Sequence, residues 1–208
     1  MKYKLVIFDF DGTLADSFPW YIQVINTVAD KYRFKRIETH EIEMLRGYGA
    51  RQIVQHLGVP WWKLPLIARY MRTLTAQNIG QITLFEGVDR LLQQLSQAGV
   101  QLALVTSNSY ENVVNVLGPD HAARIKYYEC DVPIFGKRAG FQRILKQSGI
   151  PAQHALCIGD EARDIEAANK EHIPFGAVTW GFARIEALQA HRPAELFQKV
   201  DDIAAAIL

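Results

Sequence analysis

The chain has 208 residues, of which 49% are hydrophobic and 22% are charged, and its formal net charge is +1. This composition is typical of a globular protein, and the length suffices for one large core plus a smaller module. A nearly neutral charge balance argues against nucleic acid or an anionic membrane as the main partner. No apolar stretch approaches the length of a membrane span.

The first residues favour a strand rather than a signal peptide, because the apolar run after Lys2 and Lys4 is only four residues long and ends at Asp9. Cys130 and Cys157 are the only cysteines, and neither they nor the six histidines have metal-site spacing. We interpret both cysteines as small buried hydrophobic residues in a reducing compartment. We therefore expect a cytoplasmic protein.

The apolar run Leu5–Phe8 predicts a buried strand that leads into Asp9-Phe10-Asp11-Gly12-Thr13-Leu14. Residues i and i+2 of an extended backbone point the same way, so the carboxylates of Asp9 and Asp11 would crowd together beyond the strand. Open α/β sheets bind their ligands at this edge. Two like charges so close require a cation or a proton. The alternative is a solvated turn, because Asp and Gly are both common in turns.

Residues 16–83 contain no convincing strand. Helical patterns occur there, separated by glycines and prolines, at about 17–33, 39–46, 50–57 and 62–79. So much helix is too long for a simple crossover between strands. We therefore predict a small α-helical cap domain over residues 16–83, inserted after the first strand, and a core domain made of residues 1–15 and 84–208.

The rest of the chain alternates between strand and helix patterns. We expect further strands at 102–105, 125–128, 155–158 and 175–179, and helices at 88–98, 109–117, 138–147 and 161–170. This alternation predicts a parallel sheet covered by helices on both faces. The expected fold class is therefore α/β, with a Rossmann-like parallel sheet at the core.

Polar residues follow two of the later strands. Thr106-Ser107-Asn108-Ser109 offers a hydroxyl and turn amides at the start of a helix, which suits a phosphate. Ser and Asn are also common as helix N-caps, so both interpretations remain open. The loop 133–138 carries Lys137, which could compensate carboxylates and bind a phosphoryl oxygen. Lysines in loops are usually just solvated, and only its neighbours single this one out.

A last acidic segment, Gly159-Asp160-Glu161-Ala162-Arg163-Asp164, follows the strand predicted at 155–158. Asp160 and Asp164 are four residues apart at a helix start and share one face, where acids also suit the helix dipole. Carboxylates, a lysine and a hydroxyl would thus meet at one edge of the sheet. Hard oxygen ligands with room for water favour Mg²⁺ over zinc. Such a set predicts phosphoryl transfer.

Four segments resemble, in chain order, the four motifs of the haloacid dehalogenase superfamily: residues 9–14, residues 106–108, Lys137 and residues 159–164. The resemblance extends over essentially the whole chain and includes Leu14-Ala15-Asp16-Ser17, Phe85-Glu86-Gly87 and Thr179-Trp180-Gly181. The chain is most similar to the phosphoglycolate-phosphatase-like branch, whose helical cap is inserted after the first strand. The resemblance implies a Mg²⁺-dependent phosphatase that acts on a small phosphorylated metabolite.

The resemblance also implies residue roles. Asp9 would be the nucleophile that forms an aspartyl-phosphate, and Asp11 would be the general acid and then the general base. Dehalogenating members lack an acid at this second position, so Asp11 favours a phosphatase. Mg²⁺ would be held by Asp9, the main-chain carbonyl of Asp11 and Asp160, with Asp164 orienting the site from near the metal.

Thr106, Ser107, Asn108 and Lys137 would bind the transferred phosphoryl group, according to the same resemblance. Lys137 would also neutralise Asp9 and let a carboxylate approach an anionic substrate. Arg138 stands where many relatives have Pro, so it is a competing candidate for the role of Lys137.

The segment Leu45-Arg46-Gly47-Tyr48-Gly49-Ala50-Arg51 resembles the cap loop that helps relatives select a leaving group. Arg46 and Arg51 could bind an anionic leaving group such as a carboxylate. The alternative is a glycine-rich helix joint with solvated arginines. Two other functions stay open: a phosphomutase of the β-phosphoglucomutase type, and a non-catalytic binding or regulatory protein. The sequence does not specify the oligomeric state.

Overall fold

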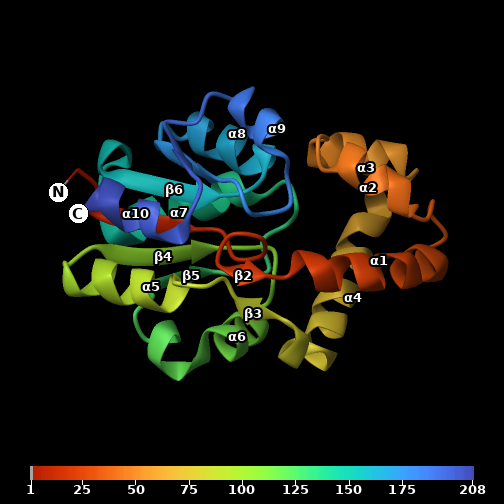
Figure 1. The fold of residues 1–208 in the computed structure, drawn as a ribbon, viewed down its shortest axis with the longest axis horizontal. Coiled ribbons are helices and arrows are strands. Elements are labelled where there is room, and N and C mark those ends of the chain that lie inside the picture. The colour runs from red at the N-terminus through yellow and green to blue at the C-terminus, as the bar shows by residue number, and fades with distance from the viewer. Residues whose placement is uncertain (1) are drawn as a thin grey trace.

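The computed structural model describes residues 2–208. Its centre is a six-stranded sheet in the order β5-β4-β1-β6-β7-β8, in which every neighbouring pair is parallel (Figure 1). The strands are β1 (Leu5–Phe8), β4 (Gln101–Val105), β5 (Tyr127–Glu129), β6 (Ala155–Gly159), β7 (Phe175–Val178) and β8 (Glu195–Phe197). The predicted α/β fold with a parallel sheet is confirmed.

Helices cover both faces of this sheet. The helices of one face are α5 (Val88–Gln97), α6 (Tyr110–Ala122) and α10 (Val200–Ile207), and those of the other are α7 (Lys137–Ser148), α8 (Ala162–Lys170) and α9 (Ile185–Gln189). Strand β1 contributes Val6 and Phe8 to the first core and Leu5 and Ile7 to the second. Successive strand residues point to opposite faces, so a run that is apolar at every position is what a doubly covered strand requires.

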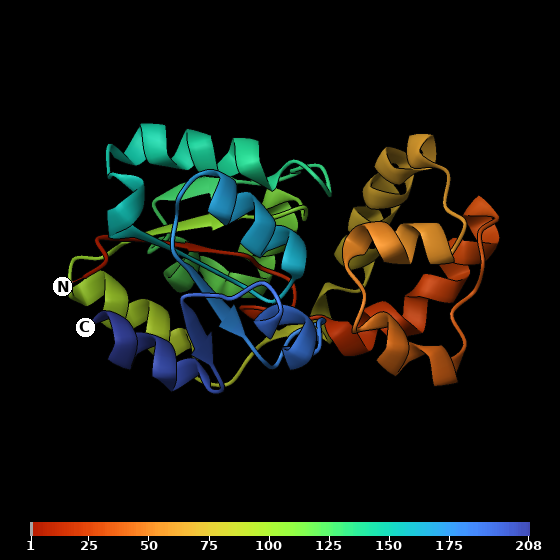
Figure 2. The same cartoon turned by 90° about the horizontal axis from the view of Figure 1, so that it is seen from above.

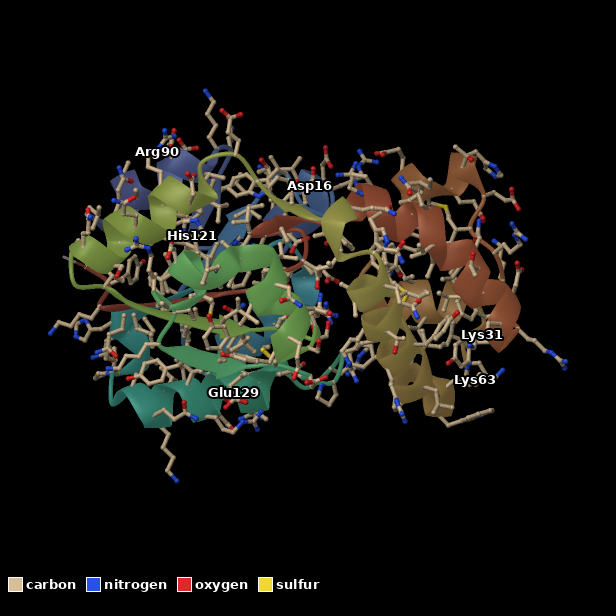
Figure 3. All side chains as sticks on the ribbon, turned by 90° about the horizontal axis from the view of Figure 1, so that it is seen from below. Asp16, Lys31, Lys63, Arg90, His121 and Glu129 are labelled. Atoms are coloured by element: carbon tan, nitrogen blue, oxygen red, sulfur yellow. The ribbon has the colours of Figure 1, made fainter. Side chains whose placement is uncertain are left out.

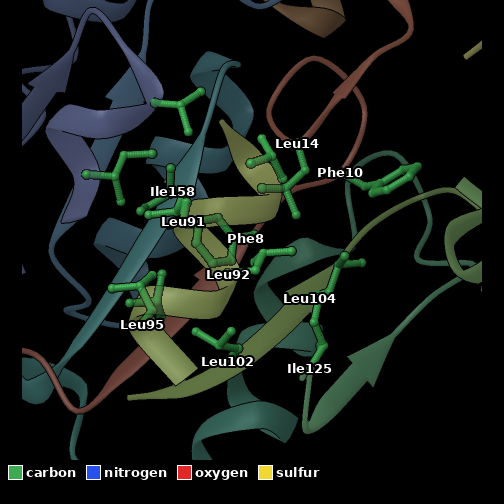
Figure 4. Packing of buried hydrophobic residues seen from close by; sticks show 14 of the residues in the cluster. Phe8, Phe10, Leu14, Leu91, Leu92, Leu95, Leu102, Leu104, Ile125 and Ile158 are labelled. Carbon is green, nitrogen blue, oxygen red and sulfur yellow. The ribbon is translucent and has the colours of Figure 1, made fainter. Parts of the chain in front are cut away.

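Figure 4 shows the packing of the first core. Leu91, Leu92 and Leu95 of α5 lie against Leu102 of β4 and Phe8 of β1, and all five side chains are at most 1% exposed. Burial on this scale holds β1 and β4 at fixed positions relative to each other. The residues that follow these strands are therefore fixed as well.

Two short strands lie where we predicted none. β2 (Ala15–Asp16) pairs antiparallel with β3 (Thr83–Leu84), so the expectation of no strand in residues 16–83 is wrong at both ends. Strands of two residues are too short to leave a periodic pattern. The pair joins the two points at which the chain leaves and re-enters the sheet region. We also missed β8, α9 and α10; β8 has three residues at a sheet edge and is equally hard to detect.

Between β2 and β3 lie four helices, which we call the cap helices. They are α1 (Phe18–Tyr32), α2 (Ile42–Leu45), α3 (Ala50–His56) and α4 (Leu64–Gln77), with 3₁₀ turns at Thr39–Glu41, Trp61–Lys63 and Ile79–Gln81. Figure 2 shows them as a group beside the sheet. In Figure 3, Asp16 lies at the junction, whereas Lys31 and Lys63 lie at the far end of this group. The cap helices have a small apolar core of their own.

The two cysteines differ in their burial. Cys157 on β6 is buried as expected, whereas Cys130 is only partly buried because it follows the edge strand β5.

Throughout residues 2–208, every helix is too short or too polar to cross a bilayer.

Glu41 joins three segments of the cap. Its carboxylate accepts a hydrogen bond from Lys35 Nζ at 2.5 Å and from the main-chain N–H of Glu38 at 3.1 Å, and His56 Nε2 of α3 lies 3.1 Å away. The hydrogen bonds from Lys35 and from the Glu38 amide lower the pKa of Glu41 to about 2. These partners favour the ionised carboxylate, which fastens the loop after α1 to α3.

We expect Glu41→Gln to loosen the cap, because a neutral amide cannot hold these partners as the carboxylate does. The folded-state pKa is lowered, so the stabilisation is complete above the ordinary value of 4.5 and is lost as the pH falls toward 2. Hydrogen exchange of α3 amides at pH 7 should be faster in Glu41→Gln. The control Asp30→Asn removes an exposed pair with Arg36 and should leave exchange unchanged. Equal exchange in both variants would refute this role of Glu41.

Candidate active site

The central strands bring three of the predicted motifs to one edge of the sheet. The strand register places Phe8 of β1 beside Leu104 of β4 and Ile158 of β6. The residues just beyond these positions, Asp9 and Asp160 among them, therefore emerge side by side. Asp9 is 6% exposed and Asp160 is 0% exposed. Parallel strands that end together thus collect acidic side chains from distant parts of the chain.

A tight turn follows Asp9. The carbonyl of Phe10 accepts hydrogen bonds from the main-chain N–H groups of Leu14 and Ala15, at 2.9 and 3.0 Å. Gly12 has φ +75°, a conformation that side chains disfavour. The turn directs Thr13 back over the sheet edge, where its hydroxyl donates to Asp160 Oδ1 at 2.9 Å. A hydrogen bond thereby links the first motif, residues 9–14, to the last motif, residues 159–164.

Three acids and one lysine form the centre of the site. One carboxylate oxygen from each of Asp9, Asp160 and Asp164 lies within 4.8 Å of the others, and we call this set the carboxylate cluster. Lys137 Nζ lies 2.5 Å from Asp9 Oδ2 and 2.7 Å from Asp164 Oδ1. Lys137 begins α7, where a positive charge opposes the helix dipole. Its position is therefore explained by its acidic partners and not by local helix stability.

The crowding shifts the pKa values of the acids. Burial works to raise the pKa of Asp9, but the charges of Lys137 and Arg163 outweigh it and lower that pKa overall, so Asp9 is ionised at neutral pH. Burial raises the pKa of Asp160 well above its ordinary value, and neighbouring carboxylates add to this. Burial and the charge of Asp9 raise the pKa of Asp11 to about 6. The site therefore holds more buried negative charge than its cations offset.

The chemistry of the donor set fits a magnesium ion. Hard carboxylate oxygens are the ligands that Mg²⁺ prefers, and a divalent cation would offset the excess negative charge of the carboxylate cluster. The Asp160 carboxylate is held on two sides, by the hydroxyl of Thr13 and by the main-chain N–H of Phe182 at 2.7 Å. A ligand fixed in this way needs little reordering to bind a metal.

The second predicted motif lies beside Asp11. The main-chain N–H of Asn108 donates to Thr106 Oγ1 at 3.0 Å, and Asn108 Nδ2 donates to Asp11 Oδ2 at 3.1 Å. Asn112 Nδ2 in turn donates to Asn108 Oδ1 at 2.9 Å and fixes which end of the amide faces Asp11. Ser107 is only partly buried and borders the same space. This motif therefore lies beside Asp11 and borders the space next to it.

The two adjacent cations of the third motif point to different places. Lys137 is 3% exposed and contacts the carboxylate cluster. Arg138 is exposed and pairs with Glu171 at 2.5 Å. Of these two candidates, the structure brings only Lys137 to the carboxylates.

The two arginines of the predicted cap loop are also separated. Arg51 is exposed, and its guanidinium lies 5.4 Å from the centre of the Phe135 ring. Arg46 donates hydrogen bonds to the carbonyls of Gly181 and Phe182, at 3.1 and 3.0 Å. Arg46 thus contacts the loop after β7, whereas Arg51 faces Phe135 in the loop before α7.

Sequence reasoning missed three residues of this site. Thr13 and Phe182 hold Asp160, and Arg163 lowers the pKa of Asp9. Arg163 stands between Asp160 and Asp164 at a helix start, a position that could have singled it out. Phe182 has no such local signal, because the loop after β7 reaches Asp160 only in the folded protein.

The chain belongs to the haloacid dehalogenase-like hydrolase family, which it matches over residues 6–178. It is 32% identical to a phosphoglycolate phosphatase of Synechococcus elongatus over 206 residues, covering 98% of this chain and 97% of the relative. It is 27% identical to a phosphoglycolate phosphatase of Xanthomonas campestris over 191 residues, covering 86% and 84%. The family resemblance inferred from the motifs is therefore confirmed.

Solved structures share this fold over its full length. A Lactobacillus plantarum protein described as a candidate phosphoglycolate phosphatase superposes with a TM-score of 0.84 at 26% identity, covering 100% of both chains. A haloacid dehalogenase-like hydrolase from Streptococcus pneumoniae superposes with a TM-score of 0.79 at 18% identity, covering 100% of this chain and 99% of the other. The second likeness shows the fold alone.

We expect Gly12→Ala to disrupt the metal site while Gly58→Ala does not. Both glycines have positive φ, +75° and +64°, so alanine costs about 1 kcal/mol of backbone strain at either position. Only at Gly12 would the added methyl group collide with the Asp160 carboxylate and the Phe182 ring; at Gly58 nothing lies within 4 Å. Mg²⁺ should raise the Tm of the wild type and of Gly58→Ala, but not of Gly12→Ala. An equal Mg²⁺-dependent rise in both variants would argue against a metal site at the carboxylate cluster.

Proposed function

We propose that this hydrolase cleaves small phosphomonoesters through a phosphorylated Asp9, with Mg²⁺ as its cofactor. The observation that carries the proposal is the position of Asp9, which contacts Lys137 and lies beside the other two acids of the carboxylate cluster. A carboxylate can attack a phosphate dianion only where their repulsion is offset. Lys137 supplies one such charge at 2.5 Å.

In the first step an oxygen of Asp9 forms a bond to phosphorus, and the bond from phosphorus to the alcohol oxygen breaks. Asp11 gives its proton to that alcohol oxygen. In the second step Asp11 takes a proton from water, whose oxygen forms a bond to phosphorus. The bond from phosphorus to the Asp9 oxygen breaks, which releases phosphate and restores the Asp9 carboxylate. The hydrogen bond from Asn108 holds the Asp11 carboxyl in place for both transfers.

The transferred phosphoryl group would lie between the second and third motifs. Lys137 would bind one of its oxygens, and the segment Thr106, Ser107 and Asn108 would bind others. The N-terminus of α6 supports this assignment, because helix N-termini favour anions. The hydroxyl of Thr106 already accepts the Asn108 amide, so its own proton is free to be donated.

Asp9, the main-chain carbonyl of Asp11 and Asp160 would hold Mg²⁺, with Asp164 fixing Lys137 beside them. When bound, this cation supplies positive charge that stabilises the developing charge on the phosphoryl oxygens. The hydrogen bonds from Thr13 and Phe182 keep Asp160 oriented toward it.

The names of the relatives support a phosphatase with a small phosphorylated metabolite as its partner. They do not favour the phosphomutase alternative. A non-catalytic binding protein is not favoured either, since Asp9, Asp11, Lys137 and Asp160 are all present and adjacent. The cap helices would exclude bulk water when they close over the site.

We expect Asp9→Asn to lower kcat for p-nitrophenyl phosphate by on the order of 10³-fold or more, because an amide is a poor nucleophile. The control Asp30→Asn lies on the exposed surface of α1 and should retain wild-type activity. Labelled substrate should leave a hydroxylamine-sensitive phosphate on the wild type and none on Asp9→Asn. Normal Mg²⁺-dependent turnover by a folded Asp9→Asn enzyme would rule the mechanism out.

We expect EDTA to abolish phosphate release and Mg²⁺ to restore it, because the buried acids otherwise repel the substrate. Phosphate release is measured before chelation, after it and after Mg²⁺ is added back. The far-ultraviolet circular dichroism spectrum, recorded in parallel, should not change. Undiminished release in excess EDTA would contradict a divalent cofactor.

A further inference from the structure

A chamber of about 290 Å³ opens from the site into the interior of the cap. Its inner end is bordered by Asp11 and Asn108, which lie beside the proposed phosphoryl position. Its outer end is bordered by Ile37 and Val54 of the cap. Because the proton donor Asp11 borders the chamber, the alcohol part of a substrate would extend into it.

The cap part of the chamber is apolar. Its walls come from all four cap helices, through Ile25 of α1, Ile42 of α2, Ile53 of α3, and Ile67 and Met71 of α4. An apolar cavity of about 150 Å³ is enough to hold benzene. The chamber therefore has room for an alcohol much larger than the two-carbon glycolate group.

The cations that border the chamber already have partners. In the part of the chain that the structure describes, they are Arg46, Arg72 and Arg163. Arg46 donates to two carbonyls of the loop after β7 and pairs with Glu43 at 3.1 Å. A carboxylate that recruited Arg46 would compete with bonds that fasten the cap to the sheet region.

The other two arginines are held in the same way. Arg72 of α4 donates to the carbonyl of Ser107 at 3.2 Å and pairs with Asp131 at 2.9 Å. Arg163 donates to the carbonyl of Ile134 at 2.9 Å and pairs with Glu161 at 2.5 Å. Each guanidinium thus faces one carboxylate and at least one carbonyl. A buried carboxylate without a free cation costs several kcal/mol.

We infer that the preferred substrates are phosphomonoesters of apolar alcohols, with an alkyl or aryl group seated in the cap chamber. This inference rests on the proposed function and narrows its substrate class. It differs from the activity named for the relatives, whose substrate carries a carboxylate. The chamber would gain affinity by burying apolar surface while the three arginine contacts stay intact.

The first experiment compares two esters of the same shape on the wild-type enzyme with Mg²⁺. Both esters carry an end group of three heavy atoms on the same CH2–O–phosphate unit. In isobutyl phosphate this group is an apolar isopropyl group, and in 2-phosphoglycolate it is a carboxylate. We expect kcat/KM to be about tenfold or more higher for isobutyl phosphate, because only its end group is compatible with apolar walls.

The second experiment varies the length of the alkyl group, while the leaving group remains a primary alcohol. From ethyl to butyl to hexyl phosphate, kcat/KM should rise roughly three- to fourfold per methylene until the chamber is full. Ala68→Leu fills part of the chamber from α4, so it should lower kcat/KM for hexyl phosphate at least about tenfold and leave ethyl phosphate unchanged. Ala76→Leu, an exposed position on the same helix, should change neither.

The outcomes separate this inference from the proposed function. Hydrolysis of 2-phosphoglycolate as fast as isobutyl phosphate, or a flat alkyl series, would overturn the apolar-substrate inference and leave the phosphatase intact. Failure to hydrolyse any of these esters, with folded protein and Mg²⁺, would overturn both. The wild-type comparisons decide the matter even where Ala68→Leu fails to fold.

Discussion

The ion pairs of Lys137 with Asp9 and Asp164 are the interaction on which the site depends. Three carboxylates and one ammonium group are buried together, so removal of Lys137 would leave all three acids without their shared cation. The sheet register fixes two of the acids, and α7 and α8 supply the lysine and the third. Charges can be held so closely only because apolar packing on both faces leaves the strand ends no freedom to separate.

The cap is joined to this rigid core by polar contacts and by apolar packing. Arg46 and Arg72 extend from the cap to main-chain carbonyls at the sheet edge, while the paired strands β2 and β3 tie the two chain crossings together. Apolar contacts add to these, because Trp20 of α1 is buried in the first core and Met71 and Leu74 of α4 pack against that core. The same arginines that seat the cap also border the chamber.

The sequence predicts most of the core and the centre of the site. Continuous apolar strands such as Leu5–Phe8 and the acids that follow them are local patterns, and strand register then brings those acids together. Three features have no local pattern: the two-residue strands, the edge strand β8, and the return of Phe182 to Asp160. The chamber is equally hidden, because an isoleucine that lines a cavity follows the same helical periodicity as one that fills a core.

Phe182 connects the edge of the sheet to the cap. Its main-chain N–H holds the Asp160 carboxylate, and its ring packs against Phe18 and Tyr21 of α1, with centroids 5.0 and 5.6 Å apart. One residue therefore contacts both the Asp160 carboxylate and the cap. A displacement of the Phe182 backbone would change a hydrogen bond at the sheet edge and an aromatic contact of α1 together.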